Sequence, residues 1–172
     1  MSEVLTAFSA TATTVDVTKV ISCENFSCVN RLLRVTALVR RFIVLVKKPQ
    51  GERKTLKVLT TEKINEAEAL WLKSLQRSLF ADHRYPQWQE KSGLFVDESS
   101  LIRCKVRIEH ADVPYSSRNP VLLPNFHPFT DLLILVCHRR VAHNGVKDTL
   151  SELRSRFWVI RGRQVVRRAL FR

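Results

Sequence analysis

Two histidines near the carboxyl-terminal end of the sequence have the residue type and spacing of metal ligands. His138 and His143 are five positions apart and are followed directly by Asn144 and Gly145, which tolerate the positive φ angles of a tight turn. Neutral imidazoles bind zinc, and this spacing falls within the range of structural zinc sites. We therefore expect His138 and His143 to bind zinc from the end of a helix and the turn that follows it.

A structural zinc ion is almost always bound by four ligands, and the sequence offers few others nearby. Cys137 directly precedes His138, so in a helix its side chain points about 100° away, and we interpret it as a buried thiol. His127 is a candidate third ligand by its distance in sequence alone. The zinc site is therefore expected to be incomplete in this chain.

Arginines concentrated in the last twenty residues could bind phosphate groups. The 172-residue chain has a formal net charge of +13, a surplus that favours a polyanionic partner such as nucleic acid. The alternative interpretation is a solvated helix face that binds nothing. The candidate residues are Arg154, Arg156, Arg161, Arg163, Arg167, Arg168 and Arg172.

The sequence lacks the residue patterns of catalytic sites. It has no glycine-rich phosphate loop and no evident Ser/His/Asp arrangement, while Asp97 and Glu98 fall in a predicted turn where carboxylates are common. We therefore expect no enzymatic activity. Hydrophobic residues make up 45% of the chain, but the sequence contains no long uncharged apolar run. We therefore expect neither a membrane span nor a secretory signal. The four cysteines are expected to be reduced thiols.

The spacing of apolar residues predicts an α+β fold, mainly α. Residues 1–25 are expected to be a poorly ordered leader, and residues 26–93 a helix pair followed by a loop. The helices should span 29–47, with Ser27 as N-cap and Phe42 and Val46 on the apolar face, and about 61–80, capped by Thr60 or Thr61.

Short strands are expected over residues 94–126, beginning with a hairpin of 94–96 and 101–108 and ending with an extended run over 120–124. Residues 127–172 should form a small helical unit. Its first helix should span 129–140 with Thr130 as a cap, a second should carry Leu150 and Leu153, and a third should begin at Gly162.

The carboxyl-terminal segment VAHNGVKDTLSELRSRFWV resembles the H2C2 integrase zinc-binding domain of BEL/Pao-type retrotransposon polyproteins. Upstream, FSCVNRLLRVTALVRRFI and LTTEKINEAEALWLKSLQ are similar to the connector between RNase H and integrase in those polyproteins. The run LIRCKVRI resembles the family's LRCGGRI, with Lys105 and Val106 in place of the two glycines.

The resemblance implies that His138 and His143 are the first half of a zinc site that a Cys-x-x-Cys pair completes. Such a pair would be expected beyond Arg172, and without it residues 128–172 would be loosely folded. The implied function is nucleic-acid binding linked to DNA integration, by a polyprotein fragment without catalysis of its own.

The resemblance also implies the partners and the location of the protein. DNA is the expected partner. Other domains of the polyprotein, or a second copy of this chain, are further expected partners. The expected location is intracellular, in the nucleus or in a cytoplasmic particle. The competing interpretations are a structural or interaction module without a nucleic-acid role, and a degenerate remnant of the element.

Overall fold

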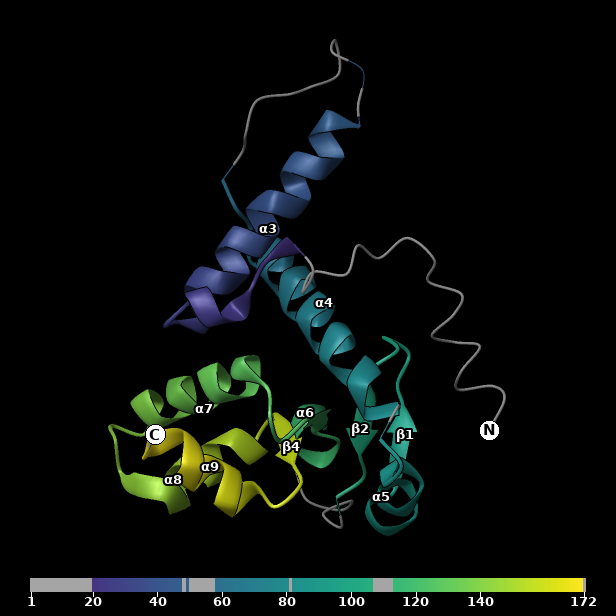
Figure 1. Cartoon of the computed structure of the whole chain (residues 1–172), viewed down its shortest axis with the longest axis vertical. Helices are drawn as coiled ribbons and strands as arrows, with labels where there is room; N and C mark the ends of the chain where they lie inside the picture. The colour runs from purple at the N-terminus through teal and green to yellow at the C-terminus, as the bar shows by residue number, and fades with distance from the viewer. Residues whose placement is uncertain (1–19, 48, 50–57, 81, 107–112, 172) are drawn as a thin grey trace.

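The computed structural model describes residues 20–47, 49, 58–80, 82–106 and 113–171. These residues form a mainly helical α+β fold with a small four-stranded sheet, as the sequence predicts (Figure 1). Residues 1–19 of the predicted leader and the candidate phosphate ligand Arg172 lie outside the described residues. The prediction of a poorly ordered leader is wrong for its described end, because Cys23–Asn25 form the short helix η1 and Ile21 and Cys23 are buried in the core. None of the described helices is long and apolar enough to cross a membrane.

Helices α3 (Val29–Val46) and α4 (Thr61–Phe80) form the predicted helix pair. Cys28, rather than Ser27, is the N-cap of α3, because the carbonyl of Cys28 accepts the first helical hydrogen bond from Leu32 N. The first half of α3 is buried against α4 and α7, whereas the second half extends beyond both (Figure 1). Phe42 and Val46 are therefore exposed, contrary to the prediction that they belong to the buried face.

Part of the predicted loop over residues 81–93 is a helix. Helix α5 (Tyr85–Ser92) begins with Pro86 in its first turn, where the missing N–H removes no helical bond. The carboxylate of Asp82 accepts a hydrogen bond from Arg84 N at 2.9 Å and so organises the turn before the helix. Gly93 ends α5 in the left-handed conformation that glycine adopts at low cost.

The sheet has the strand order β1 (Leu94–Val96), β2 (Ile102–Cys104), β3 (Val121–Leu123) and β4 (Phe157–Val159). The predicted hairpin and extended run are confirmed as β1–β2 and β3. The second strand is shorter than predicted, because residues 105 and 106 are not part of it, and residues 107 and 108 lie outside the described residues. Strand β4 and the short helix α6 (Tyr115–Arg118) were not predicted. Strand β4 is parallel to β3, so the carboxyl-terminal unit contributes a strand to the common sheet.

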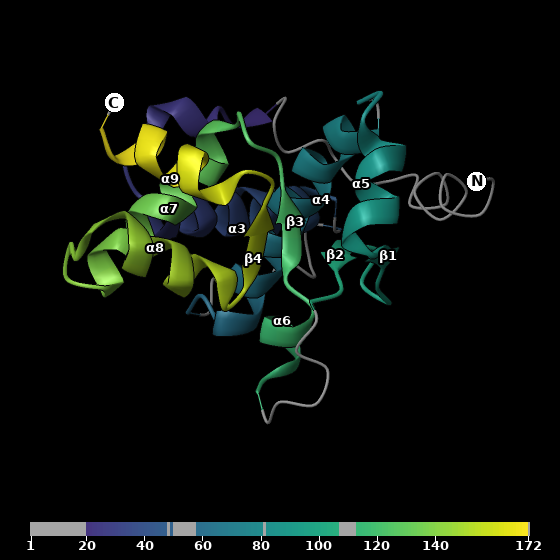
Figure 2. The ribbon, with the colours of Figure 1, turned by 90° about the horizontal axis from the view of Figure 1, so that it is seen from below.

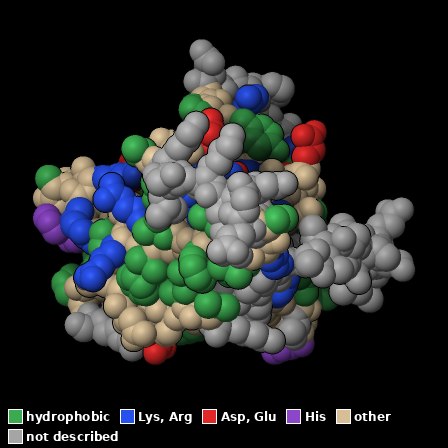
Figure 3. Space-filling view, turned by 90° about the horizontal axis from the view of Figure 1, so that it is seen from above, with side chains coloured by type: hydrophobic (Ala, Val, Ile, Leu, Met, Phe, Trp, Pro, Cys, Tyr) green, Lys and Arg blue, Asp and Glu red, His purple; other side chains and the backbone are tan. Residues whose placement is uncertain are grey.

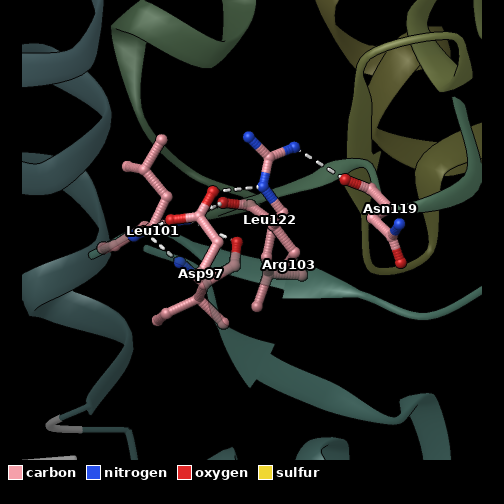
Figure 4. Close-up of polar contacts among 7 residues, drawn as sticks. Asp97, Leu101, Arg103, Asn119 and Leu122 are labelled. Carbon is pink, nitrogen blue, oxygen red and sulfur yellow. Dashed lines mark hydrogen bonds and ion pairs between the residues drawn. The ribbon is translucent and has the colours of Figure 1, made fainter. Parts of the chain in front are cut away.

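Asp97 and Arg103 fix the hairpin to the segment before β3 (Figure 4). Asp97 accepts a hydrogen bond from Leu101 N at 2.9 Å and pairs through its other oxygen with Arg103 Nε. Arg103 Nη1 then donates to the carbonyl of Asn119 at 2.7 Å. These carboxylate contacts are structural, in agreement with the prediction that Asp97 belongs to a turn.

The side chain of Gln76 joins α4 to the sheet. It is fully buried, its Nε2 donates to the carbonyls of Ile102 and Leu122 at 2.9 and 2.8 Å, and its Oε1 accepts from Ile102 N at 2.8 Å. The described ladder between β2 and β3 holds a single residue pair. The Gln76 amide therefore supplies hydrogen bonds that the short ladder does not provide.

Helices α7 (Pro128–Arg140), α8 (Gly145–Arg154) and α9 (Gly162–Leu170) lie at the end of the sheet away from α5 (Figure 2). Thr130 is not the cap of α7: it is buried and donates to the Pro124 carbonyl at 3.0 Å. His127 is the N-cap, and its Nδ1 accepts from Phe129 N at 3.1 Å.

A single hydrophobic cluster contains buried side chains from α3, α4, α7, α8, β4 and α9. A second, smaller cluster packs α5 against the sheet and includes the partly buried Trp88. The carboxyl-terminal helices thus share their core with the amino-terminal helix pair, and a bound metal ion is not their only source of packing.

Candidate metal and nucleic-acid site

The turn after α7 brings the two predicted metal ligands together. His143 N donates to the carbonyl of His138 at 2.9 Å, and Ala142 N donates to the carbonyl of Arg139 at 3.1 Å. These two bonds define a Schellman motif, in which Ala142 occupies the left-handed position with φ of 50°. The longer bond of the motif joins residues five positions apart, so the His138–His143 spacing matches the geometry of the turn.

The turn differs in one respect from the sequence prediction, which assigned positive φ to Asn144 and Gly145. Gly145 has φ of 83°, but Asn144 has φ of −74° and instead precedes α8 as its N-cap. Ala142 and His143, with φ of 50° and 62°, take the left-handed conformation in its place. This conformation costs a residue with a side chain about 1–2 kcal/mol, and the hydrogen bonds of the motif offset part of that cost.

The imidazole rings of His138 and His143 lie edge to face, with centroids 4.6 Å apart and an interplanar angle of 85°. Two imidazoles bound to one zinc ion at ~2.0–2.1 Å would have ring centres about 5 Å apart. The observed separation is close to that value. The separation of the rings is therefore compatible with both histidines binding the same ion.

Thr149 determines which nitrogen of His138 can bind a metal. Thr149 Oγ1 lies 2.7 Å from the Gly145 carbonyl, to which it donates its only proton, and 2.9 Å from His138 Nδ1. Toward His138 the hydroxyl can therefore act only as an acceptor, which assigns the ring proton to Nδ1. The lone pair of a neutral His138 is then on Nε2, the arrangement that a hydrogen-bonded metal-binding histidine adopts.

The other candidate ligands do not join this pair. His127 caps the opposite end of α7, about 16 Å along the helix axis from His138. Cys137 is buried, and burial raises the pKa of its thiol to about 11, which opposes the thiolate form that binds zinc. Within the part of the chain that the structure describes, no three His, Cys, Asp or Glu side chains gather as a metal site. The described residues fit half of a tetrahedral site.

Three of the predicted phosphate-binding arginines are exposed at or on α9. Arg163 and Arg167 are one helical turn apart on the same face, and Arg161 precedes the helix with φ of 55°. The remaining face of α9 is buried through Val165 and Val166. The predicted orientation of this helix is confirmed for these residues.

The other described arginines of the predicted set contact groups of the protein itself. Arg168 is only partly exposed, donates to Asp131 Oδ1 at 2.9 Å and to the Asn125 carbonyl at 2.7 Å, and thus departs from the predicted outward orientation. Arg156, directly before β4, pairs with Glu68 of α4 at 2.8 Å. Arg154 is exposed beside the Trp158 ring, 5.2 Å from its centroid.

Sequence reasoning did not identify Thr149 as part of the histidine site. A threonine within an amphipathic segment has no distinctive spacing, and its contact with His138 depends on how α8 packs against α7. The sequence also gives no sign of a shared surface for the basic and aromatic residues of α5, because its pattern predicts a loop over residues 81–93. Residues of α5 and α9, which are far apart in the sequence, line one cavity in the folded chain.

Comparisons with known proteins identify no relative: no protein-family model, curated protein or solved structure matches the chain.

Proposed function

We propose that this chain is a zinc- and nucleic-acid-binding segment of a retroelement polyprotein, acting in DNA integration inside the cell and without catalysis of its own. In this proposal His138 and His143 provide half of an H2C2 zinc site. A cysteine pair from another polypeptide segment supplies the other half. The sequence resemblance motivates the family, and the geometry around the two histidines supports the metal site.

The observation that carries the proposal is the hydrogen bond between His138 and Thr149. Because Thr149 Oγ1 donates to Gly145 O, it holds the proton of His138 on Nδ1 and leaves Nε2 as the metal-binding atom. A partly buried histidine that only packs against its neighbours has no requirement for the tautomer with its proton on Nδ1. The hydrogen bond also fixes the ring orientation, which lowers the cost of binding an ion.

The exposed arginines support the nucleic-acid part of the proposal. Arg163 and Arg167 present two guanidinium groups on one face, and the chain as a whole carries a formal net charge of +13. Contacts of this kind are made to phosphates, and their strength falls as salt concentration rises. The expected binding is therefore sensitive to salt and largely independent of base sequence.

Zinc titration by isothermal calorimetry tests the metal site. We expect one weak site in this chain, lost in His138→Ala and in His143→Ala, and retained in His83→Ala, whose histidine side chain is 89% exposed away from the pair. Thr149→Val should weaken binding by about 10- to 100-fold, while Thr149→Ser should preserve it. Zinc binding that is unchanged in both His138→Ala and His143→Ala would refute the site.

DNA binding is tested by fluorescence anisotropy with a labelled duplex over a series of salt concentrations. The double variant Arg163→Gln/Arg167→Gln should weaken binding and reduce the slope of log affinity against log salt by about two. Arg31→Gln/Arg34→Gln, at two exposed positions of α3, is the matched control for the loss of two charges. An unchanged slope in the α9 variant would exclude this face as the contact.

A second candidate function is a protein-interaction module, favoured by the exposed second half of α3. Leu38, Phe42, Val44 and Val46 are 49%, 66%, 51% and 52% exposed, and hydrophobic side chains gather on the face seen from above (Figure 3). Apolar patches of this kind commonly mark sites of association. Absence of salt-sensitive DNA binding would favour this candidate over the first.

A further inference from the structure

A cavity of about 440 Å³ lies between α5 and the first turns of α9, away from the histidine pair. In Figure 2, α5 and α9 lie on opposite sides of β3, and both helices contribute residues to the lining of the cavity. Its volume is within the range of about 300–1,000 Å³ that is typical of small-molecule pockets. One nucleotide is a ligand of suitable size.

The described lining of the cavity is basic. It contains Arg84, Lys91, Arg161 and Arg168, and no carboxylate is among the described lining residues. Arg84 and Arg168 are held by ion pairs at 2.7 and 2.9 Å to aspartates that lie outside the lining, whereas Lys91 and Arg161 are exposed. A concave surface lined by one sign of charge concentrates ligands of the opposite sign. The cavity therefore favours an anion.

Two aromatic side chains line the same cavity and are each flanked by an arginine. Phe126 is 81% exposed, and the Arg168 guanidinium lies 4.7 Å from its ring centroid. Trp88 is on the α5 side, with the Arg84 guanidinium 5.1 Å from its ring centroid. An exposed phenylalanine ring has no role in the core, but it offers a flat surface on which a nucleobase can stack.

Amide side chains complete the lining. Gln87 from α5 and Gln164 from α9 are exposed at the cavity and can each donate to and accept from the edge of a base. Gln164 belongs to the first turn of α9, where the helix dipole adds to the attraction for a phosphate. Cations, flat aromatic rings and amides are thus combined in one cavity, the set of groups that nucleotide recognition uses.

We propose that this cavity binds an unpaired nucleotide of a single-stranded nucleic acid, with its base against Phe126 and its phosphate near Lys91 and Arg161. A base in a duplex is stacked on both faces and cannot reach an aromatic ring in a cavity, so the site selects single strands. The proposal deepens the nucleic-acid binding proposed above by assigning single strands to a surface distinct from Arg163 and Arg167.

Fluorescence anisotropy with a labelled oligothymidylate and with a labelled blunt duplex tests the proposal on the whole chain. Phe126→Ala should weaken binding of the oligothymidylate by about 5- to 100-fold and change duplex binding by less than about twofold. Phe171→Ala is the matched control, because Phe171 is 76% exposed at the far end of α9. Circular dichroism confirms that each variant is folded.

Variants that remove one charge distinguish binding in the cavity from binding to Arg163 and Arg167 on the exposed face of α9. Lys91→Ala and Arg161→Gln should each reduce the salt slope for the oligothymidylate by about one, whereas Arg34→Gln should not. Oligothymidylate binding that is unchanged in Phe126→Ala, or weakened equally with duplex binding, overturns the cavity proposal. If the Phe126, Lys91 and Arg161 variants leave binding unchanged but Arg163→Gln/Arg167→Gln weakens it, only the cavity proposal fails. If the chain binds neither the oligothymidylate nor the duplex, both the cavity proposal and the proposed nucleic-acid function fail.

Discussion

The indole ring of Trp71 is stacked on the phenyl ring of Phe129, with centroids 5.4 Å apart and an interplanar angle of 8°. Trp71 also donates its indole N–H to Thr36 Oγ1 at 3.0 Å, and Thr36 Oγ1 donates to the Leu32 carbonyl at 2.9 Å. One fully buried side chain on α4 therefore joins α3 to α7. The helix pair and the histidine-bearing unit are parts of one packed core.

Phe129→Ala should lower the free energy of unfolding by about 3–5 kcal/mol, because it removes a fully buried ring and leaves a cavity beside Trp71. Since the core is shared, α3, α4 and the carboxyl-terminal helices should unfold in a single transition. Urea denaturation followed by circular dichroism and by tryptophan fluorescence measures both. Phe126→Ala, which removes an 81% exposed ring nearby in sequence, should cost less than about 0.5 kcal/mol. Two separate transitions would contradict the shared core.

The paired helices were predictable because their buried residues recur at helical spacing. Val29, Leu32 and Leu33 on α3, and Ala67, Trp71 and Leu75 on α4, show the pattern that a core-facing helix requires. The same pattern continues through Phe42 and Val46, which are exposed. Periodicity identifies an apolar face, but only the packing of other elements decides how much of that face is buried.

Gln76→Leu should lower the free energy of unfolding by about 3 kcal/mol or more, although leucine is apolar and similar in size. The substitution leaves three buried backbone groups of β2 and β3 without the partner that the Gln76 amide provides. Hydrogen exchange at the Ile102 amide should accelerate, since its N–H donates to Gln76 Oε1. Gln89→Leu, on an exposed position of α5, is the control and should change stability by less than about 0.5 kcal/mol. Equal stability of the two variants would show that the amide is dispensable.

The role of Gln76 could not be predicted from sequence, because a glutamine next to Leu75 fits the polar boundary of a helix equally well. Its partners are backbone groups 26 and 46 positions away, and their arrival at α4 depends on the complete sheet. The proximity of the two histidines could be predicted from the sequence, because it depends on a local turn and not on distant segments. His138 and His143 are joined by a local turn whose own hydrogen bond spans five residues.

Ala142→Gly should raise the free energy of unfolding by roughly 1 kcal/mol. Ala142 has φ of 50°, a conformation that glycine adopts without the steric cost of a Cβ, although glycine loses more backbone entropy on folding. Thermal denaturation measures the change. Ala69→Gly, inside α4, is the control with the opposite sign and should lower stability by about 1 kcal/mol. A loss of stability in Ala142→Gly would show that the Cβ of Ala142 has no steric cost in the left-handed conformation that exceeds the entropy loss of glycine.

His127 should make the protein less stable in mild acid. Burial lowers the pKa of its imidazole, against the carboxylates of Asp131 and Glu24, which act to raise it. Nδ1 of His127 must also be unprotonated to accept from Phe129 N. The folded state therefore binds a proton less readily than the unfolded state, whose histidine titrates near pH 6.5.

The stabilisation that follows from this difference is fully present above about pH 6.5 and is lost as the pH falls through the lowered pKa of the folded state. His127→Asn keeps a side chain that caps a helix well but does not titrate in this range. The free energy of unfolding, measured by urea denaturation between about pH 5 and 8, should therefore fall less steeply with acid in His127→Asn than in the parent chain. Every other residue is the same in the two proteins, so the contribution of the rest of the chain cancels in the difference. Parallel curves for the two proteins would mean that His127 has the same pKa in the folded and unfolded states.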